Sequence, residues 1–242
     1  MWSVTVLDPF LPSPSLAAWL LPASLLYAGG AAIAAGHLRV VRGMRAPYTR
    51  KIFHFMIFTA AGALQIVWGL PAVVVFGSVT SALVLYAVWR GDGFPFYEAM
   101  ARPTDAPRRT LFILIPLATT ALGGVTANVL FPAWAFVGYL VCGWGDAVGE
   151  PVGARWGAHR YRVPSMGGIA STRSLEGSLA VFVAGSAATA AALLLQGLPG
   201  LQVLLLALGS GLAGAIVEAI STHGLDNLTV QVAASAAAQF LA

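Results

Sequence analysis

Long apolar stretches, each close to the length of a membrane-spanning helix, dominate this sequence. A helix needs about 20 apolar residues to cross a bilayer. Stretches of that kind occupy residues 15–36, 53–70, 71–89, 110–131, 132–150, 177–196 and 200–221, and a shorter one occupies 228–242. Only 9% of the residues are charged, against about 25% in a soluble domain. The sequence therefore predicts an all-α fold, a polytopic transmembrane helical bundle of 7–8 spans that forms one integral-membrane domain over residues 1–242.

The basic residues predict how the bundle is oriented. All 13 of them fall in three connections, after the first, third and fifth spans, and the alternate connections around Pro71, Pro132 and Pro199 hold none. Because basic loops stay in the cytoplasm, we expect these three connections there and both termini outside. Residues 1–14 lack the charged start of a cleaved signal peptide, so we expect the first span to be retained.

Two residue counts exclude familiar kinds of site. Cys142 is the single cysteine, so an internal disulfide and a cysteine-based metal centre are ruled out. Lys51 is the single lysine and is followed by Ile52, whereas a P-loop needs Ser or Thr after its lysine. A nucleotide would have to be bound in another way.

Five of the nine carboxylates lie in or beside apolar spans, where an acid is costly by about 2.5 to 3.5 kcal/mol at mid-bilayer. These five are Asp146, Glu150, Glu176, Glu218 and Asp226. The other four, Asp8, Asp92, Glu98 and Asp105, are interpreted as solvated charges of the outer terminus and of a loop. The first group is where we expect function.

Asp146 and Glu150 are four residues apart, so on a helix they share a face. Two carboxylates together suit Mg²⁺, which prefers a few such ligands plus substrate phosphates. Pro151 disfavours helical geometry at Glu150, which predicts a break in the helix there. The glycines that recur every fourth residue from Gly145 to Gly157 are interpreted as a stripe for close helix packing.

The segment before the sixth span has the residues of an anion site. Gly167 and Gly168 can present backbone N–H groups to an anion, and Arg173 offers a guanidinium that matches phosphate oxygens. A helix that begins near Ser174 would add its positive end. Ser174 is equally interpreted as a helix cap, with Glu176 favoured in the first turn by the helix dipole.

Two more groups of polar residues flank apolar spans. Glu218 near the end of the seventh span and Asp226 after it form a predicted carboxylate pair, although Asp226 is almost as well explained as a helix cap. Arg50 and Lys51 precede the second span and would bind either a nucleotide phosphate or anionic lipid. His54 would either accept a hydroxyl proton or bond a backbone carbonyl.

Four separated motifs resemble those of the CTP-dependent lipid kinases: dolichol kinase, phytol kinase and the CTP-using diacylglycerol kinase. They are Thr49-Arg50-Lys51-Ile52-Phe53-His54, Gly145-Asp146-Ala147 through Gly153, Arg173-Ser174-Leu175-Glu176-Gly177-Ser178, and Glu218 with Gly224-Leu225-Asp226-Asn227-Leu228-Thr229-Val230. The resemblance covers about residues 48–232. The sequence departs from the family at Arg173, where lysine is usual, and at Glu150, where a small or polar residue is common.

The resemblance implies CTP as phosphoryl donor, a divalent cation such as Mg²⁺, and a lipid hydroxyl as acceptor. It implies catalytic roles for Asp226, His54 and Glu218, metal binding by Asp146 and Glu150, and nucleotide or phosphate binding by Arg50, Lys51, Gly167, Gly168, Arg173, Ser174, Glu176, Gly177 and Asn227. An isoprenoid alcohol of the phytol, polyprenol or dolichol type is the expected substrate.

Three alternatives remain open at this point. The chain would be a diacylglycerol kinase, a phosphatidate cytidylyltransferase that releases pyrophosphate, or a small transporter whose acids bind a cation. We expect a bacterial inner-membrane protein with a cytoplasmic active site, CTP and a membrane lipid as partners, and no nucleic acid partner. Assembly as a homo-oligomer is left open.

Overall fold

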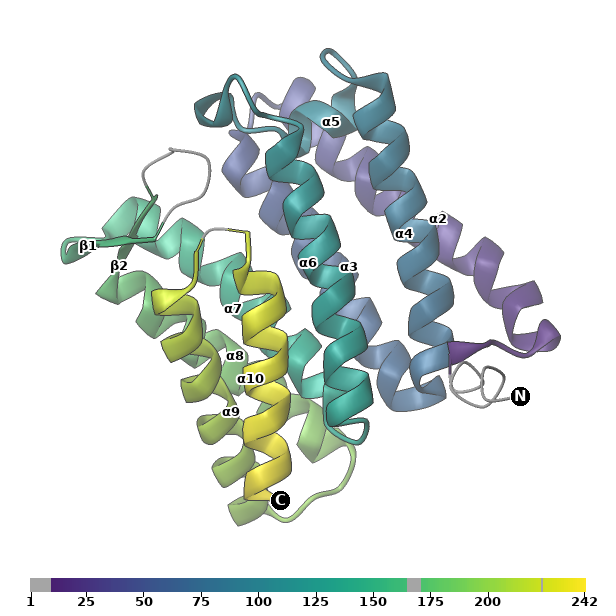
Figure 1. Cartoon of the computed structure of the whole chain (residues 1–242), viewed down its shortest axis with the longest axis vertical. Coiled ribbons are helices and arrows are strands. Elements are labelled where there is room, and N and C mark those ends of the chain that lie inside the picture. The colour runs from purple at the N-terminus through teal and green to yellow at the C-terminus, as the bar shows by residue number, and fades with distance from the viewer. Residues whose placement is uncertain (1–9, 165–170, 223) are drawn as a thin grey trace. The chain divides into compact units, whose positions relative to one another are not determined.

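The computed structural model describes residues 10–164, 171–222 and 224–242, and these are 80% helical. The described residues form nine α-helices, a short 3-10 turn and one two-stranded hairpin (Figure 1). The chain divides into two compact units, residues 1–100 and 101–242. Whether the chain acts as one domain stays a prediction.

The first unit packs three long helices and one short helix. They are α2 (Pro14–Val40), α3 (Ala46–Trp68), α4 (Leu70–Arg90) and α5 (Pro95–Met100). Ser13 caps α2, because its side chain accepts a hydrogen bond from the N–H of Leu16 at 3.2 Å. Gly69 has φ +71°, a conformation that glycine adopts without strain, and it makes the tight turn from α3 to α4 just before Pro71.

The second unit packs five helices, and two strands form a hairpin at one end. Its elements are a 3-10 turn η2 (Pro103–Asp105), α6 (Leu111–Leu130), α7 (Ala135–Trp156), β1 (Arg160–Val163), β2 (Ser171–Ser174), α8 (Leu175–Leu195), α9 (Gly200–Ile220) and α10 (Asp226–Leu241). Helix α10 packs against α6, α7 and α9, and α7 packs against α8. Figure 1 shows α10 lying between α9 and α6.

The predicted all-α polytopic membrane bundle is confirmed. Six helices are long and apolar enough to cross a membrane: α2, α3, α4, α6, α8 and α9. Helices α7 and α10 occupy the fifth and eighth predicted spans, and neither is among the six. The count of 7–8 spans and the outer position of the N-terminus therefore stay predictions.

Two local features differ from expectation. Helix α7 does not break before Pro151 but continues to Trp156. The physical reason is close packing, since this part of α7 lies against the start of α8: the Gly149 carbonyl would be 3.0 Å from a Cβ at Gly177. The β-hairpin was also not predicted, because its strands are only four residues long and lie in a polar segment.

The glycine stripe of α7 packs as predicted. A Cβ at Gly145 would lie 2.8 Å from a Val181 side-chain carbon, and one at Gly153 would lie 3.0 Å from the Ser174 hydroxyl. Both neighbours belong to α8 or to its cap. The stripe therefore brings the polar end of α7 against the residue that begins α8, and this contact helps to build the site.

Candidate functional site

Arg173 joins three segments of the second unit through ion pairs. Its guanidinium contacts the Glu218 carboxylate at the end of α9, and its Nη2 lies 3.1 Å from Asp226 Oδ2 at the start of α10. Nη2 also donates to the Ser221 carbonyl at 3.3 Å. We call Arg173, Glu218 and Asp226 the Arg173 cluster. The structure thus brings together three residues that the sequence singled out separately.

The Arg173 cluster is largely shielded from solvent and has an unbalanced charge. Each of its three side chains is only 12% exposed. One guanidinium faces two carboxylates, so the ionised cluster carries a net negative charge. The Nε of Arg173 is buried and has no hydrogen-bond acceptor among the described residues. A buried group of this kind is costly unless a further partner satisfies it.

The β-hairpin and the first turn of α8 determine where Arg173 points. Arg173 pairs with Tyr161 across the two strands, so both side chains lie on the same face of the hairpin. The Tyr161 hydroxyl is 3.0 Å from that of Ser178 on α8. Ser174 caps α8 by accepting from the N–H of Gly177 at 3.1 Å, as predicted.

Glu176 also holds the hairpin in place. Its carboxylate lies 2.7 Å from His159 Nδ1 and accepts from the His159 backbone N–H at 3.2 Å. Glu176 stands in the first turn of α8, as predicted for a residue that the helix dipole favours. Its observed contacts are those of a structural brace, and its predicted part in nucleotide binding stays a prediction.

A second arginine forms a similar arrangement with the acids of α7. Arg102 Nη1 lies 3.2 Å from Glu150 Oε1, and its Nε lies 3.1 Å from Asp105 Oδ2. We call Arg102, Asp105 and Glu150 the Arg102 cluster. Burial lowers the pKa of Arg102, but the nearby carboxylates of Glu150, Asp105 and Asp146 outweigh it, so that pKa is raised above its usual value. This side of α7 is therefore electrostatically suited to a cation.

Sequence reasoning missed Arg102 and Asp105. Asp105 was interpreted as a solvated loop charge, yet its side chain is only 5% exposed. The one available signal was local: the two residues are three apart and of opposite charge beside Pro103. A loop distant in the sequence from Glu150 carries no pattern that would reveal the contact.

Asn227 lies at the start of α10, but its side chain points into the core. It is only 5% exposed, and its Nδ2 donates to the Thr120 hydroxyl of α6 at 2.9 Å. The thiol of Cys142 lies 3.8 Å from its Oδ1. These contacts make Asn227 part of the packing between α6, α7 and α10.

The remaining predicted residues lie elsewhere or outside the described chain. Arg50, Lys51 and His54 belong to α3 in the first unit, where Lys51 is buried and the His54 ring stacks on Phe58 with centroids 4.2 Å apart. Gly167 and Gly168 lie outside the described residues.

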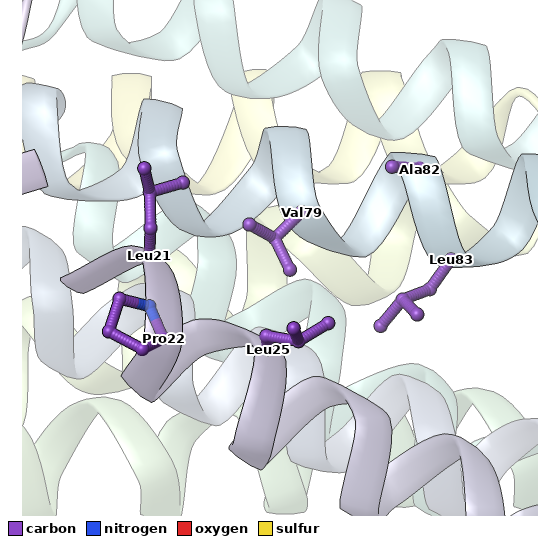
Figure 2. Close-up of a pocket in the computed structure, with 6 residues that line it drawn as sticks. All are labelled: Leu21, Pro22, Leu25, Val79, Ala82 and Leu83. Carbon is purple, nitrogen blue, oxygen red and sulfur yellow. The ribbon is translucent and has the colours of Figure 1, made fainter. Parts of the chain in front are cut away.

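The first unit also has an apolar groove of about 360 Å³ between α2 and α4 (Figure 2). Figure 2 shows the side chains that line it: Leu21, Pro22, Leu25, Val79, Ala82 and Leu83. The groove offers no charged group for chemistry. The two arginine clusters of the second unit, in contrast, contain charged side chains that are largely shielded from solvent.

Comparison with known proteins identifies the family. The chain is 30% identical over 209 residues to a phytol kinase of Synechocystis sp., and the match covers 84% of this chain and 83% of that protein. This chain belongs to the phytol kinase family. The predicted membership of a lipid kinase family is thereby confirmed. No protein family model matches the chain, and no solved structure matches it.

In this member of the phytol kinase family, two arginines each contact two carboxylates. Arg173 stands where lysine is usual in the lipid kinases. A guanidinium can bond two carboxylates in fixed directions, whereas an ammonium is a point charge. The departure at Arg173 therefore has a structural counterpart in the double ion pair with Glu218 and Asp226.

Proposed function

We propose that the protein transfers a phosphoryl group from CTP to the hydroxyl of a membrane isoprenoid alcohol of the phytol type. The observation that carries this proposal is the match to a phytol kinase, which covers most of this chain and most of that protein. The Arg173 cluster supports it through alignment, because phosphoryl transfer depends on positioned charged groups and needs no covalent intermediate with the protein.

Arg173 is the proposed contact to the nucleotide phosphates. Its guanidinium is placed between two carboxylates, and its buried Nε, which has no acceptor among the described residues, would donate to a phosphate oxygen that entered the cluster. The first turn of α8, capped by Ser174 and continued by Gly177, provides a helix N-terminus beside it. Phosphate binding by Arg50 and Lys51 of the first unit, and by Gly167 and Gly168 outside the described residues, stays a prediction.

Glu218 and Asp226 are the proposed proton acceptors for the lipid hydroxyl, and the catalytic role predicted for His54 of the first unit stays a prediction. Both carboxylates contact the Arg173 guanidinium, which fixes their direction. An ionised carboxylate within hydrogen-bond reach of the hydroxyl can accept its proton as the oxygen attacks the terminal phosphorus. The proton leaves the hydroxyl, the new O–P bond forms, and the bond from the terminal phosphate to CDP breaks.

Asp146 and Glu150 fit a magnesium ion, provided that the substrate supplies further ligands. They offer two carboxylates one turn apart on α7, and Glu150 would have to exchange its contact with Arg102 for the metal ion. Among the described residues, no group of three or more His, Cys, Asp or Glu side chains could hold a metal ion. Mg²⁺ commonly binds with one or two carboxylates plus phosphates and water, and it would neutralise phosphate charge.

The cytoplasmic face of a bacterial inner membrane is the proposed place of the reaction. The basic connections and both arginine clusters occur at helix ends that the charge distribution assigns to the cytoplasm. CTP would reach the site from water, and the alcohol would reach it from the bilayer.

The experiment uses the purified full-length protein in lipid nanodiscs with phytol and CTP labelled at either the α- or the γ-phosphate. Transfer of γ-label alone, with release of CDP, supports the kinase. Transfer of α-label with release of pyrophosphate would show cytidylyl transfer instead. Diacylglycerol in place of phytol, and ATP, GTP or UTP in place of CTP, test acceptor and donor. Chelation of Mg²⁺ should abolish transfer, and added Mg²⁺ should restore it.

A further inference from the structure

Helix α6 forms hydrogen bonds with residues on either side of Asp226, which belongs to the Arg173 cluster. Asn227 follows Asp226 in the chain, and its amide donates to the Thr120 hydroxyl at 2.9 Å and to the Pro116 carbonyl at 3.4 Å. Thr119, the neighbour of Thr120, donates to the Gly224 carbonyl at 2.6 Å. The residues on both sides of Asp226 are therefore tied to α6.

A second layer of contacts holds the same turn. The fully buried Gln231 donates to the Asn227 carbonyl and, at 3.3 Å, to the Thr120 carbonyl. Gly123 allows the two helices to approach this closely, because a Cβ there would lie 2.8 Å from the Cα of Leu228. The turn that carries Asp226 is thus held by hydrogen bonds that a small change in α6 would break.

We propose that Thr119, Thr120 and Asn227 are positioning residues, which place Asp226 against Arg173. None of the three is in contact with the Arg173 guanidinium by any described hydrogen bond, so they act through the backbone of α10. In this proposal Asn227 serves the reaction from the core, through its contact with Thr120. The inference rests on the proposed function, because it assumes that Asp226 and Arg173 belong to the site of transfer.

The substitution Thr120→Val tests this directly, since it removes the hydroxyl and keeps the shape. We expect kcat for transfer from CTP to phytol to fall at least tenfold, while KM for CTP changes less than about threefold. Thr120→Ser keeps the hydroxyl and should restore kcat to within about threefold of the wild type. Because Asn227 acts through Thr120, Asn227→Ala should lower kcat by a similar factor, and the double variant should be little worse than either single one.

Thr189→Val is the matched control. Thr189 is a fully buried threonine of α8 in the same unit, and its hydroxyl has no hydrogen-bond partner among the described residues. Its substitution should leave kcat unchanged. An unchanged kcat in Thr120→Val, a raised KM for CTP with normal kcat, or fully multiplicative losses in the double variant would each overturn the positioning role.

Amide hydrogen exchange separates this inference from the proposed function. Thr120→Val should speed exchange in residues 224–230, whereas Thr189→Val should not. Equal exchange in Thr120→Val and wild type overturns the positioning role whatever the enzyme's activity. A wild-type protein that transfers nothing from CTP to phytol, but whose exchange responds as expected, would refute the proposed function and keep α6 as the support of Asp226.

Discussion

Arg173 is the residue on which the organisation of the site depends most. It is the common partner of Glu218 and Asp226, and it comes from a third segment of the chain. All three side chains are shielded from water, so removing the guanidinium would leave two carboxylates close together without a counter-ion. Breaking a buried ion pair in this way costs about 3 to 5 kcal/mol, and the remaining exposure of 12% places the expected cost at the lower end of that range.

Arg173→Ala should therefore lower the midpoint of thermal unfolding and abolish phosphoryl transfer. Arg173→Lys keeps the positive charge but loses the planar guanidinium with its fixed donor directions. Its midpoint of thermal unfolding should therefore be close to that of the wild type, and its activity should be reduced but not abolished. Thermal unfolding in nanodiscs and the transfer assay measure the two effects. Arg155→Ala is the control, because Arg155 is exposed and its guanidinium lies over the ring of its neighbour Trp156. Wild-type activity in Arg173→Ala would remove this residue from the site.

At this scale, the sequence predicts which residues matter better than it predicts what they touch. The cost of placing acids beside apolar spans indicated Glu218 and Asp226. The residue types of the 164–178 segment, which suit phosphate binding, indicated Arg173. The contact among them depends on the packing of α8, α9 and α10, for which no sequence spacing is informative. Asn227 shows the converse, since a motif residue with a polar side chain turned out to be buried in the core.

The elements that shape the site are α7 and α8, which approach each other closely along the glycine stripe. A Cβ at Gly149 would overlap the Val181 side chain and lie 3.1 Å from the Gly177 carbonyl. Val181 is itself buried at 2% exposure, so it cannot move aside freely. The close contact leaves no room for a side chain larger than the hydrogen atom of Gly149.

Gly149→Ala should lower the free energy of unfolding by about 1 to 3 kcal/mol, the usual cost of overpacking. Val181→Ala in the same chain removes the overlapping atoms and should recover part of that loss. Gly30→Ala on α2 is the matched control, because a Cβ there meets no atom within 4 Å. Unfolding in a denaturant series measures all three variants, and equal stability of Gly149→Ala and Gly30→Ala would contradict the close approach.

The helices themselves could be predicted because length and apolarity suffice to specify a membrane span. The exceptions have physical causes. Pro151 is tolerated within α7, where a neighbouring helix packs closely enough to keep the backbone helical. The hairpin is held by contacts to the start of α8, such as Tyr161 to Ser178, and these contacts cannot be derived from a four-residue strand.

At the scale of the whole molecule, the distribution of charge predicts which side of the protein faces the cytoplasm. Every basic residue lies in a connection that follows the first, third or fifth predicted span. Integral membrane insertion agrees with six helices of sufficient length and apolarity. The predicted orientation, with the basic connections in the cytoplasm and both termini outside, rests on the charge distribution alone.

Cysteine labelling tests that orientation, and the chain is convenient for it because Cys142→Ala leaves no other cysteine. In that background, Val41→Cys and Ala158→Cys should be protected from an impermeant maleimide added to intact cells. Ala133→Cys and Gln196→Cys should be labelled. All four positions are exposed in the structure, so accessibility within the protein does not differ. Labelling of both pairs from the same side would refute the predicted topology.

The most direct measurement of the central claim is the transfer of γ-label from CTP to phytol by the purified wild type and by three carboxylate variants. Asp146→Asn and Asp226→Asn remove charges from α7 and from the Arg173 cluster, and Asp92→Asn removes an exposed charge in the first unit. The proposed site predicts phosphorylated phytol from the wild type and Asp92→Asn, and at least a hundredfold less from the other two. Full transfer by Asp146→Asn or Asp226→Asn would contradict it.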